Sequence, residues 1–135
     1  MANTDLLRKV RHKMAAEPDT HDQSIWISAD PGQRVDHADG LALTYGTTAC
    51  VAGWTALLSG DRLIVPMYAT DDNIVTAPFD VANVFTVDGV IESVYQRARK
   101  LLDINYVFAE ALFDGGNSRG TVLTIIDQII EQEVL

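Results

Sequence analysis

Apolar residues recur at helical spacing in five stretches of the chain, and each stretch predicts a helix. The predicted helices cover residues 5–17, about 47–59, 90–102, 106–113, and a last stretch that runs from near 118 to 135. Thr4 is the expected N-cap of the first helix, and Pro18 ends it because the residue before a proline avoids helical backbone angles. The chain is therefore predicted to be mainly helical.

The second predicted helix is apolar on most of its sides. Cys50, Trp54 and Leu57 lie along one wide stripe of it. Its other positions are mostly small residues that allow a neighbouring backbone to come close, namely Ala49, Ala52, Gly53 and Ala56. Gly60 can take the left-handed conformation that ends a helix. We expect this helix to be buried at the centre of the fold.

Three short stretches have the composition of strands. They are residues 24–28, 62–68 and 81–87, and the last is a strand if it ends at the turn formed by Asp88 and Gly89. Pro66 removes a hydrogen-bond donor, so the second stretch is expected at a sheet edge or in a bent strand.

The helix predicted over 90–102 completes the expected fold. Asp88 is available as its cap, and its apolar face consists of Ile91, Val94, Ala98, Leu101 and Leu102. The fold class is predicted to be α+β and mainly helical, with one domain over residues 1–135. In it the central helix of about 47–59 is packed by the C-terminal helices, beside a small two- or three-stranded sheet.

The composition excludes several classes of protein. Apolar residues make up 47% of the 135 residues, which is too many for an intrinsically disordered chain. Cys50 has no partner within the chain, which excludes a disulfide scaffold and fits a reducing compartment. The net charge of −9 argues against a sequence-independent nucleic-acid binder, which needs a basic face. The sequence has no signal-peptide pattern and no membrane-spanning apolar run, so we expect a cytoplasmic protein that does not contact a membrane.

Two parts of the sequence resemble small uncharacterised proteins of actinobacteria and their bacteriophages. Their pattern is Cys-Gly-Thr, two residues, Cys, an aliphatic residue and Ala-Gly-His/Trp, and this chain has Gly46-Thr-Thr-Ala-Cys-Val-Ala-Gly-Trp54. Residues 98–105 and 111–117 match their helix, joint, helix and Leu-Phe-Asp…Asn turn. Tyr45 stands where the pattern has its first cysteine, which counts against any role that requires a cysteine pair. The resemblance implies an origin in such a phage or its host, and a place in the host cytoplasm, or in the virion for a structural protein.

Cys50 is the candidate nucleophile. The start of a helix presents partial positive charge and free N–H groups, which can lower the pKa of a thiol. A thiol hydrolase also needs an imidazole base, for which His37 is the nearest candidate in sequence. All three histidines precede the cysteine, whereas papain-like enzymes place theirs after it. The alternative is a buried cysteine that packs as a small apolar residue.

The candidate metal ligands are His21, His37 and Asp39, since two histidines with one or two carboxylates can bind zinc. An EF-hand is excluded, because alignment on Gly40 as the sixth position puts Val35 and Gly46 where carboxylates are required. The other interpretation is a polar surface loop, and we expect no metal.

The run 115–121 has the glycine spacing of a phosphate-binding loop. Thr121 stands in place of the required lysine, and the run follows a helix rather than a strand. We expect its glycines to end one helix and Asn117 or Ser118 to cap the next, and we expect no cofactor.

The last helix is apolar over more than half of its circumference. A surface helix normally has a narrower apolar stripe, so this helix is either deeply buried or presents its spare face to another chain. The candidate interaction residues are Ile125, Ile126, Ile129, Ile130 and Val134.

These patterns favour a non-enzymatic, phage-associated accessory protein. It would act by self-assembly as a homo-oligomer or by binding a host or virion protein. Two alternatives remain open at this point. One is the cysteine-dependent hydrolase built on Cys50, and the other is an acidic mimic of nucleic acid that occupies a DNA-binding partner.

Overall fold

A computed structural model describes residues 2–29, 32, 47–64, 67–72, 74–77 and 79–134 of the chain. The α-helices within these residues are α1 (Thr4–Ala16), α2 (Val51–Leu58), α3 (Val94–Leu102), α4 (Tyr106–Phe113) and α5 (Arg119–Val134). The strands are β1 (Ile27–Ala29), β2 (Thr47–Ala49), β3 (Arg62–Leu63), β4 (Thr70–Asp71), β5 (Ile74–Val75), β6 (Asn83–Phe85) and β7 (Ile91–Ser93). The fold is α+β and mainly helical, which confirms the predicted class.

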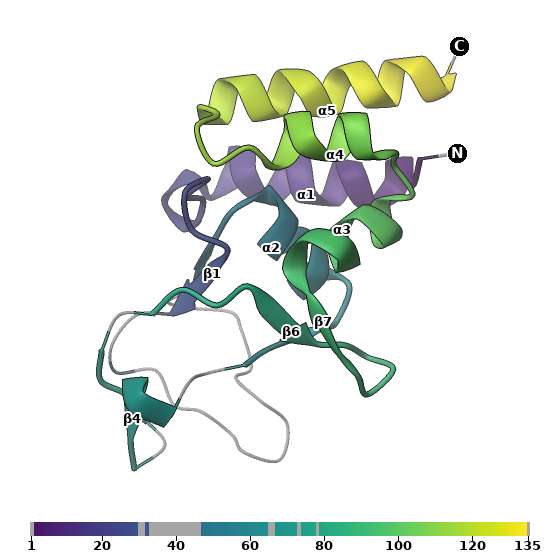
Figure 1. Cartoon of the computed structure of the whole chain (residues 1–135). Coiled ribbons are helices and arrows are strands. Elements are labelled where there is room, and N and C mark those ends of the chain that lie inside the picture. The colour runs from purple at the N-terminus through teal and green to yellow at the C-terminus, as the bar shows by residue number, and fades with distance from the viewer. Residues whose placement is uncertain are drawn as a thin grey trace.

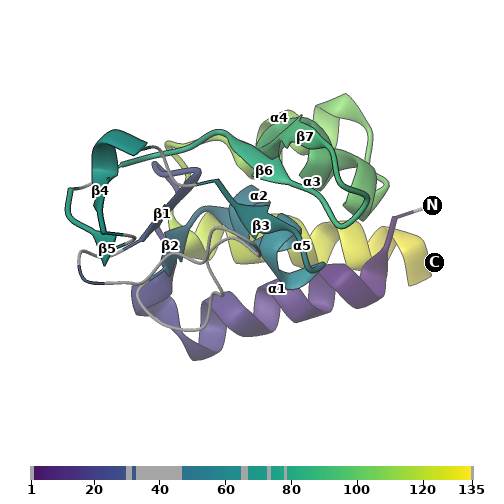
Figure 2. The same ribbon diagram turned by 90° about the horizontal axis from the view of Figure 1, so that it is seen from below.

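The helices form a layer on one side of the small sheets. Figures 1 and 2 show α1 and α5 lying side by side and running in opposite directions, so that both ends of the chain lie at the same end of the molecule. Helix α2 packs against α1 and α3, and α4 contacts both α3 and α5. Among the described residues, no helix is both long enough and apolar enough to span a membrane.

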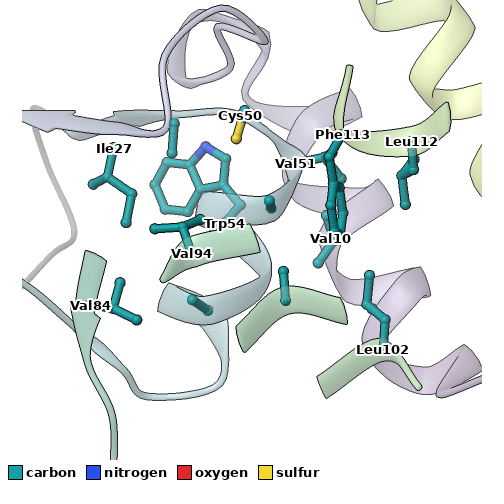
Figure 3. Close-up of a cluster of buried hydrophobic side chains, with 14 of the residues drawn as sticks. Val10, Ile27, Cys50, Val51, Trp54, Val84, Val94, Leu102, Leu112 and Phe113 are labelled. Atoms are coloured by element: carbon teal, nitrogen blue, oxygen red, sulfur yellow. The ribbon is translucent and has the colours of Figure 1, made fainter. Parts of the chain in front are cut away.

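Helix α2 is the buried centre that the sequence predicts. All residues from Val51 to Ala56 are buried, and the Trp54 indole N–H donates to the Thr20 carbonyl at 2.7 Å. Figure 3 shows the Trp54 ring at the centre of the cluster, with Ile27 and Val94 beside it. The tight packing depends on Gly53, because a Cβ at this position would lie 2.1 Å from the Trp26 carbonyl oxygen.

The predicted start of this helix is wrong by about one turn. Residues 47–49 form β2, which pairs antiparallel with β1 and places Ile27 opposite Ala49. Cys50 is the N-cap, and its sulfur accepts a hydrogen bond from the Gly53 N–H. The threonines before the cysteine have β-branched side chains that favour a strand, and β1 supplies the pairing that a local pattern does not reveal.

The other helix ends follow simple capping rules. The Asn3 side chain, rather than Thr4, caps α1 by accepting from the Leu6 N–H at 3.1 Å. Helix α4 has the predicted bounds. Ser118 accepts from the Thr121 N–H at the start of α5, as expected for the glycine-rich run.

The predicted helix over 90–102 is correct only from Val94 onward. Strand β7 (Ile91–Ser93) pairs antiparallel with β6, and β6 pairs in turn with β3, so the sheet has the order β3-β6-β7. The Ser93 hydroxyl oxygen, not Asp88, caps α3 by accepting from the Gln96 N–H at 3.2 Å. Ile91 therefore lies on a strand and outside the helical face to which the sequence assigned it.

Candidate interaction surface

Cys50 lies in an environment that keeps its thiol protonated. Only 2% of the surface of Cys50 is exposed, and this burial raises the pKa of the thiol to about 11. The thiol donates to the Trp26 carbonyl oxygen at 3.7 Å and accepts from the Gly53 N–H at 3.4 Å. The effect of burial on the pKa is therefore larger than the opposite effect of the helix N-terminus. The thiolate loses more stabilisation by water than the N–H groups of the helix start supply. With a pKa of about 11, this thiol is mostly protonated at neutral pH.

A small cavity of about 120 Å³ reaches Cys50 beside Ser24 and Trp26. Gln23 also lines it, and its side-chain amide is held by the Val51 N–H and the Leu112 carbonyl. The His21 ring nitrogen Nε2 lies 2.9 Å from Gln23 Oε1, so this imidazole is bonded to the amide. The part of the chain described by the structure therefore assembles no thiol–imidazole pair. His37 lies outside that part.

Of the candidate metal ligands, only His21 lies within the described residues. No group of three or more histidine, cysteine, aspartate and glutamate side chains there could hold a metal ion. His21 is bonded to Gln23, whereas His37 and Asp39 lie outside the described ranges.

The isoleucines of α5 are divided between the core and its margin. Ile126 and Ile129 are buried within this one chain, so they are not available for docking. Ile125 and Ile130 are half-buried and pack against the core, and the side chain of Val134 lies outside the described part. Deep burial thus accounts for much of the wide apolar stripe, because α5 lies along both α1 and α4.

Among the residues that the structure describes, the largest group of exposed apolar side chains lies on the β6–β7 hairpin instead. We call this group the hairpin patch, and its members are Phe85 (40% exposed), Val87 (61%), Val90 (54%) and Ile91 (69%). Phe85 and Ile91 are directly opposed in the strand pairing, so their side chains lie on the same face of the sheet. Val84 is fully buried on the other face. Phe85 and Ile91 therefore present apolar surface on one face, whereas Val84 supports the core from the other. Val87 and Val90 are exposed beside the turn.

A buried ion pair fixes the base of this hairpin. The Arg97 guanidinium donates from Nε to Asp61 Oδ2 at 2.6 Å and from Nη2 to Asp61 Oδ1 at 2.9 Å. Asp61 Oδ1 also accepts from the Val87 N–H at 3.1 Å, next to the hairpin turn. This bidentate geometry is the strong form of such a contact, and the hydrogen bond and the Asp61 charge raise the pKa of Arg97. The hairpin patch is consequently held in a defined position.

A second hollow lies on the outer side of α1, with a volume of about 430 Å³. Arg8, Lys9 and Lys13 line it together with Leu58 at the end of α2. The Lys13 ammonium lies 4.4 Å from the centre of the Trp54 ring and 2.9 Å from a Glu17 carboxylate oxygen. This lysine therefore helps to cover the buried indole.

Two signals in the sequence could have revealed the hairpin. Ser93 is followed by Gln96, which is the spacing of a capping box and marks a helix that starts after residue 93. Asp88-Gly89 is a strong hairpin turn when apolar stretches flank it, and Gly89 has a φ of +85°. Together they assign residues 90–93 to a strand.

Comparison of the chain with protein-family models, with curated proteins and with solved structures finds no match.

Proposed function

We propose that the protein acts by docking onto another protein through the hairpin patch, and that it is not an enzyme. The observation that carries the proposal is the exposure of four apolar side chains on one hairpin, with Phe85 and Ile91 directly opposed on the same face, and the ion pair that anchors this hairpin. Exposed apolar groups of this kind are typical of interaction sites, because their burial against a partner releases water. The protonated, enclosed state of Cys50 supports a structural role for the thiol.

The proposal moves the docking surface away from α5. Only Ile125 and Ile130 of the candidate isoleucines with described side chains are partly accessible, and both already contact the core. Association with a phage rests on the sequence resemblance alone. The nucleic-acid-mimic alternative stays a prediction.

The test is retention of proteins on the immobilised chain. Three forms are compared in lysate of an actinobacterium with and without phage infection: the natural chain, Ile91→Lys, and the matched control Val107→Lys. Val107 is as accessible as Ile91, at 76% exposure, but lies on α4. We expect the natural chain and the control to retain the same protein, or further copies of the chain itself, and Ile91→Lys to lose it.

Two results would contradict this proposal. One is an identical set of retained proteins for all three forms. The other is loss of the retained protein with Val107→Lys but not with Ile91→Lys, which would assign docking to α4.

A further inference from the structure

The hollow on the outer side of α1 gathers positive charge on a chain that is acidic as a whole. Three of the ten lysine and arginine side chains line it, namely Arg8, Lys9 and Lys13, against one carboxylate, that of Glu17. Glu17 already pairs with Lys13 at 2.9 Å. Lys9 makes no ion pair or hydrogen bond within the described residues, and Arg8 reaches a carboxylate of its own helix only at 3.8 Å. The rim of the hollow therefore holds positive charge that this chain leaves largely uncompensated.

The floor of the hollow is apolar. It is formed by Leu58, the last residue of α2, with 39% of its surface exposed. The hydrocarbon stems of lysine and arginine are also apolar, so they extend this floor toward the charged rim. The volume of about 430 Å³ is similar to that of sites that hold a small ligand, which span roughly 300–1,000 Å³. The hollow thus offers an apolar contact beside two accessible cations.

We propose that this hollow binds an acidic segment of another protein, in which carboxylates flank a large apolar side chain. The inference goes beyond the proposed function, because it assigns a second surface with a chemistry different from that of the hairpin patch. In the complex the apolar side chain covers Leu58, and the carboxylates lie opposite Arg8 and Lys9. Charge complementarity selects the partner, since opposite charges at the rim of an apolar contact favour the correct partner and repel cationic ones.

The lining favours such a segment over two other kinds of anionic partner. Single-stranded nucleic acid binds where bases stack on aromatic side chains, but the lining residues, all of them described, include no phenylalanine, tyrosine or tryptophan. An anionic membrane takes up an amphipathic helix through its apolar face. The apolar face of α1 is buried against the rest of the chain, through Leu6, Leu7, Val10 and Met14.

The test is binding of a fluorescein-labelled synthetic peptide in which pairs of glutamates alternate with single leucines. Fluorescence anisotropy is followed while the full chain is added up to about 1 mM, at about 0.05 M NaCl to limit screening. The variant Arg8→Gln/Lys9→Gln should bind the peptide about five- to tenfold more weakly, because it removes both rim charges.

The chain offers a matched control for this variant on α3. Arg99→Gln/Lys100→Gln also replaces an arginine and the lysine that follows it, so both variants change the net charge from −9 to −11. Neither Arg99 nor Lys100 lines the hollow. We expect this control to weaken binding less than about twofold, because it changes the field of the whole chain but not the rim.

The apolar floor is tested by a second peptide with serine in place of each leucine. It should bind the natural chain more weakly than the leucine peptide, because nothing then covers Leu58. In Leu58→Gln the two peptides should bind with similar affinity. Raising NaCl from about 0.05 to about 0.5 M should weaken binding of both peptides to the natural chain.

Four outcomes would overturn the proposal. They are no binding of the leucine peptide up to about 1 mM, equal losses for the two double variants, equal affinity of the leucine and serine peptides for the natural chain, and tighter binding of oligothymidylate or phosphatidylglycerol vesicles than of the leucine peptide. Ile91→Lys separates this surface from the hairpin patch, because it should still bind the peptide. Either surface can therefore fail without the other.

Discussion

Gly53→Ala should destabilise the protein, although alanine is the better helix former. The added Cβ would lie 2.1 Å from the Trp26 carbonyl oxygen, 2.8 Å from Ala49 Cβ and 2.9 Å from Ile27 Cγ1. These atoms belong to β1, β2 and the residue that precedes β1, so one backbone segment must move away from α2. The Trp26 oxygen also accepts from the Cys50 N–H at 3.3 Å, and this bond would weaken with the movement.

The magnitude follows from three opposing contributions. Overpacking a core costs about 1–3 kcal/mol, and a weakened hydrogen bond adds about 1 kcal/mol. Alanine regains about 1 kcal/mol of helix propensity over glycine. We therefore expect the free energy of unfolding to fall by about 2 kcal/mol. With a denaturant slope of about 1–3 kcal/mol per M, the urea midpoint should fall by about 1 M.

Gly120→Ala is the matched control for this measurement. Gly120 also lies in a helix, α5, but the nearest atom to its added Cβ is Ser118 Oγ at 4.0 Å. Its urea midpoint should stay constant or rise. An unchanged or higher midpoint for Gly53→Ala would refute the close approach of α2 to β1.

Three further predictions concern buried groups. Between about pH 9 and 11, the natural chain should lose roughly 2–3 kcal/mol of stability relative to Cys50→Ala, as measured by urea unfolding at each pH. The reason is that the thiol of the unfolded chain ionises around its ordinary pKa of 9.0, whereas the buried thiol of the folded chain stays protonated up to about pH 11. A difference that does not change with pH would contradict the burial of this thiol. Arg97→Met should lower the free energy of unfolding by about 3–5 kcal/mol, because it leaves the buried Asp61 carboxylate unpaired, and a loss below about 1 kcal/mol would show that water reaches the pair. Ile126→Ala should cost about 2–5 kcal/mol and Ile125→Ala clearly less, and equal losses in thermal unfolding would show that α5 does not sit as described.

The sequence predicts those elements whose signals are local. Helix α4 has its predicted bounds because Asn105 caps its first turn, accepting from the Phe108 N–H, and Asp114 with two glycines follows it. The buried character of α2 follows from a stretch with no charged residue. Both features depend on neighbours within a few positions, so a reading of the chain alone can find them.

The errors occur where a distant segment decides the structure. Residues 47–49 become a strand because β1 lies beside them, and Ile91 becomes a strand residue because it faces Phe85. The same limit applies to α5. Its apolar stripe predicts that another element packs on this helix. Only the position of α1 shows that the element packed near Ile126 belongs to the same chain.

Three positions of the segment that carries the resemblance have a structural explanation. Cys50 caps α2 with its sulfur, Gly53 permits close contact with the Trp26 carbonyl, and the Trp54 indole donates to the Thr20 carbonyl. Burial of this thiol raises its pKa and so favours the protonated form. Capping and packing therefore account for Cys50, Gly53 and Trp54 in this segment.

A docking surface gains affinity when it is already ordered before the partner arrives, because less conformational entropy is lost on binding. The hairpin meets this condition through Asp61, which joins the Val87 N–H beside the turn to Arg97 on α3. The same carboxylate is fully buried, so the anchor is also one of the groups on which the core depends. If the hairpin patch is the docking surface we propose, a single ion pair contributes both to stability and to docking. A variant of Arg97 should weaken association through a looser hairpin even though it leaves every side chain of the hairpin patch unchanged.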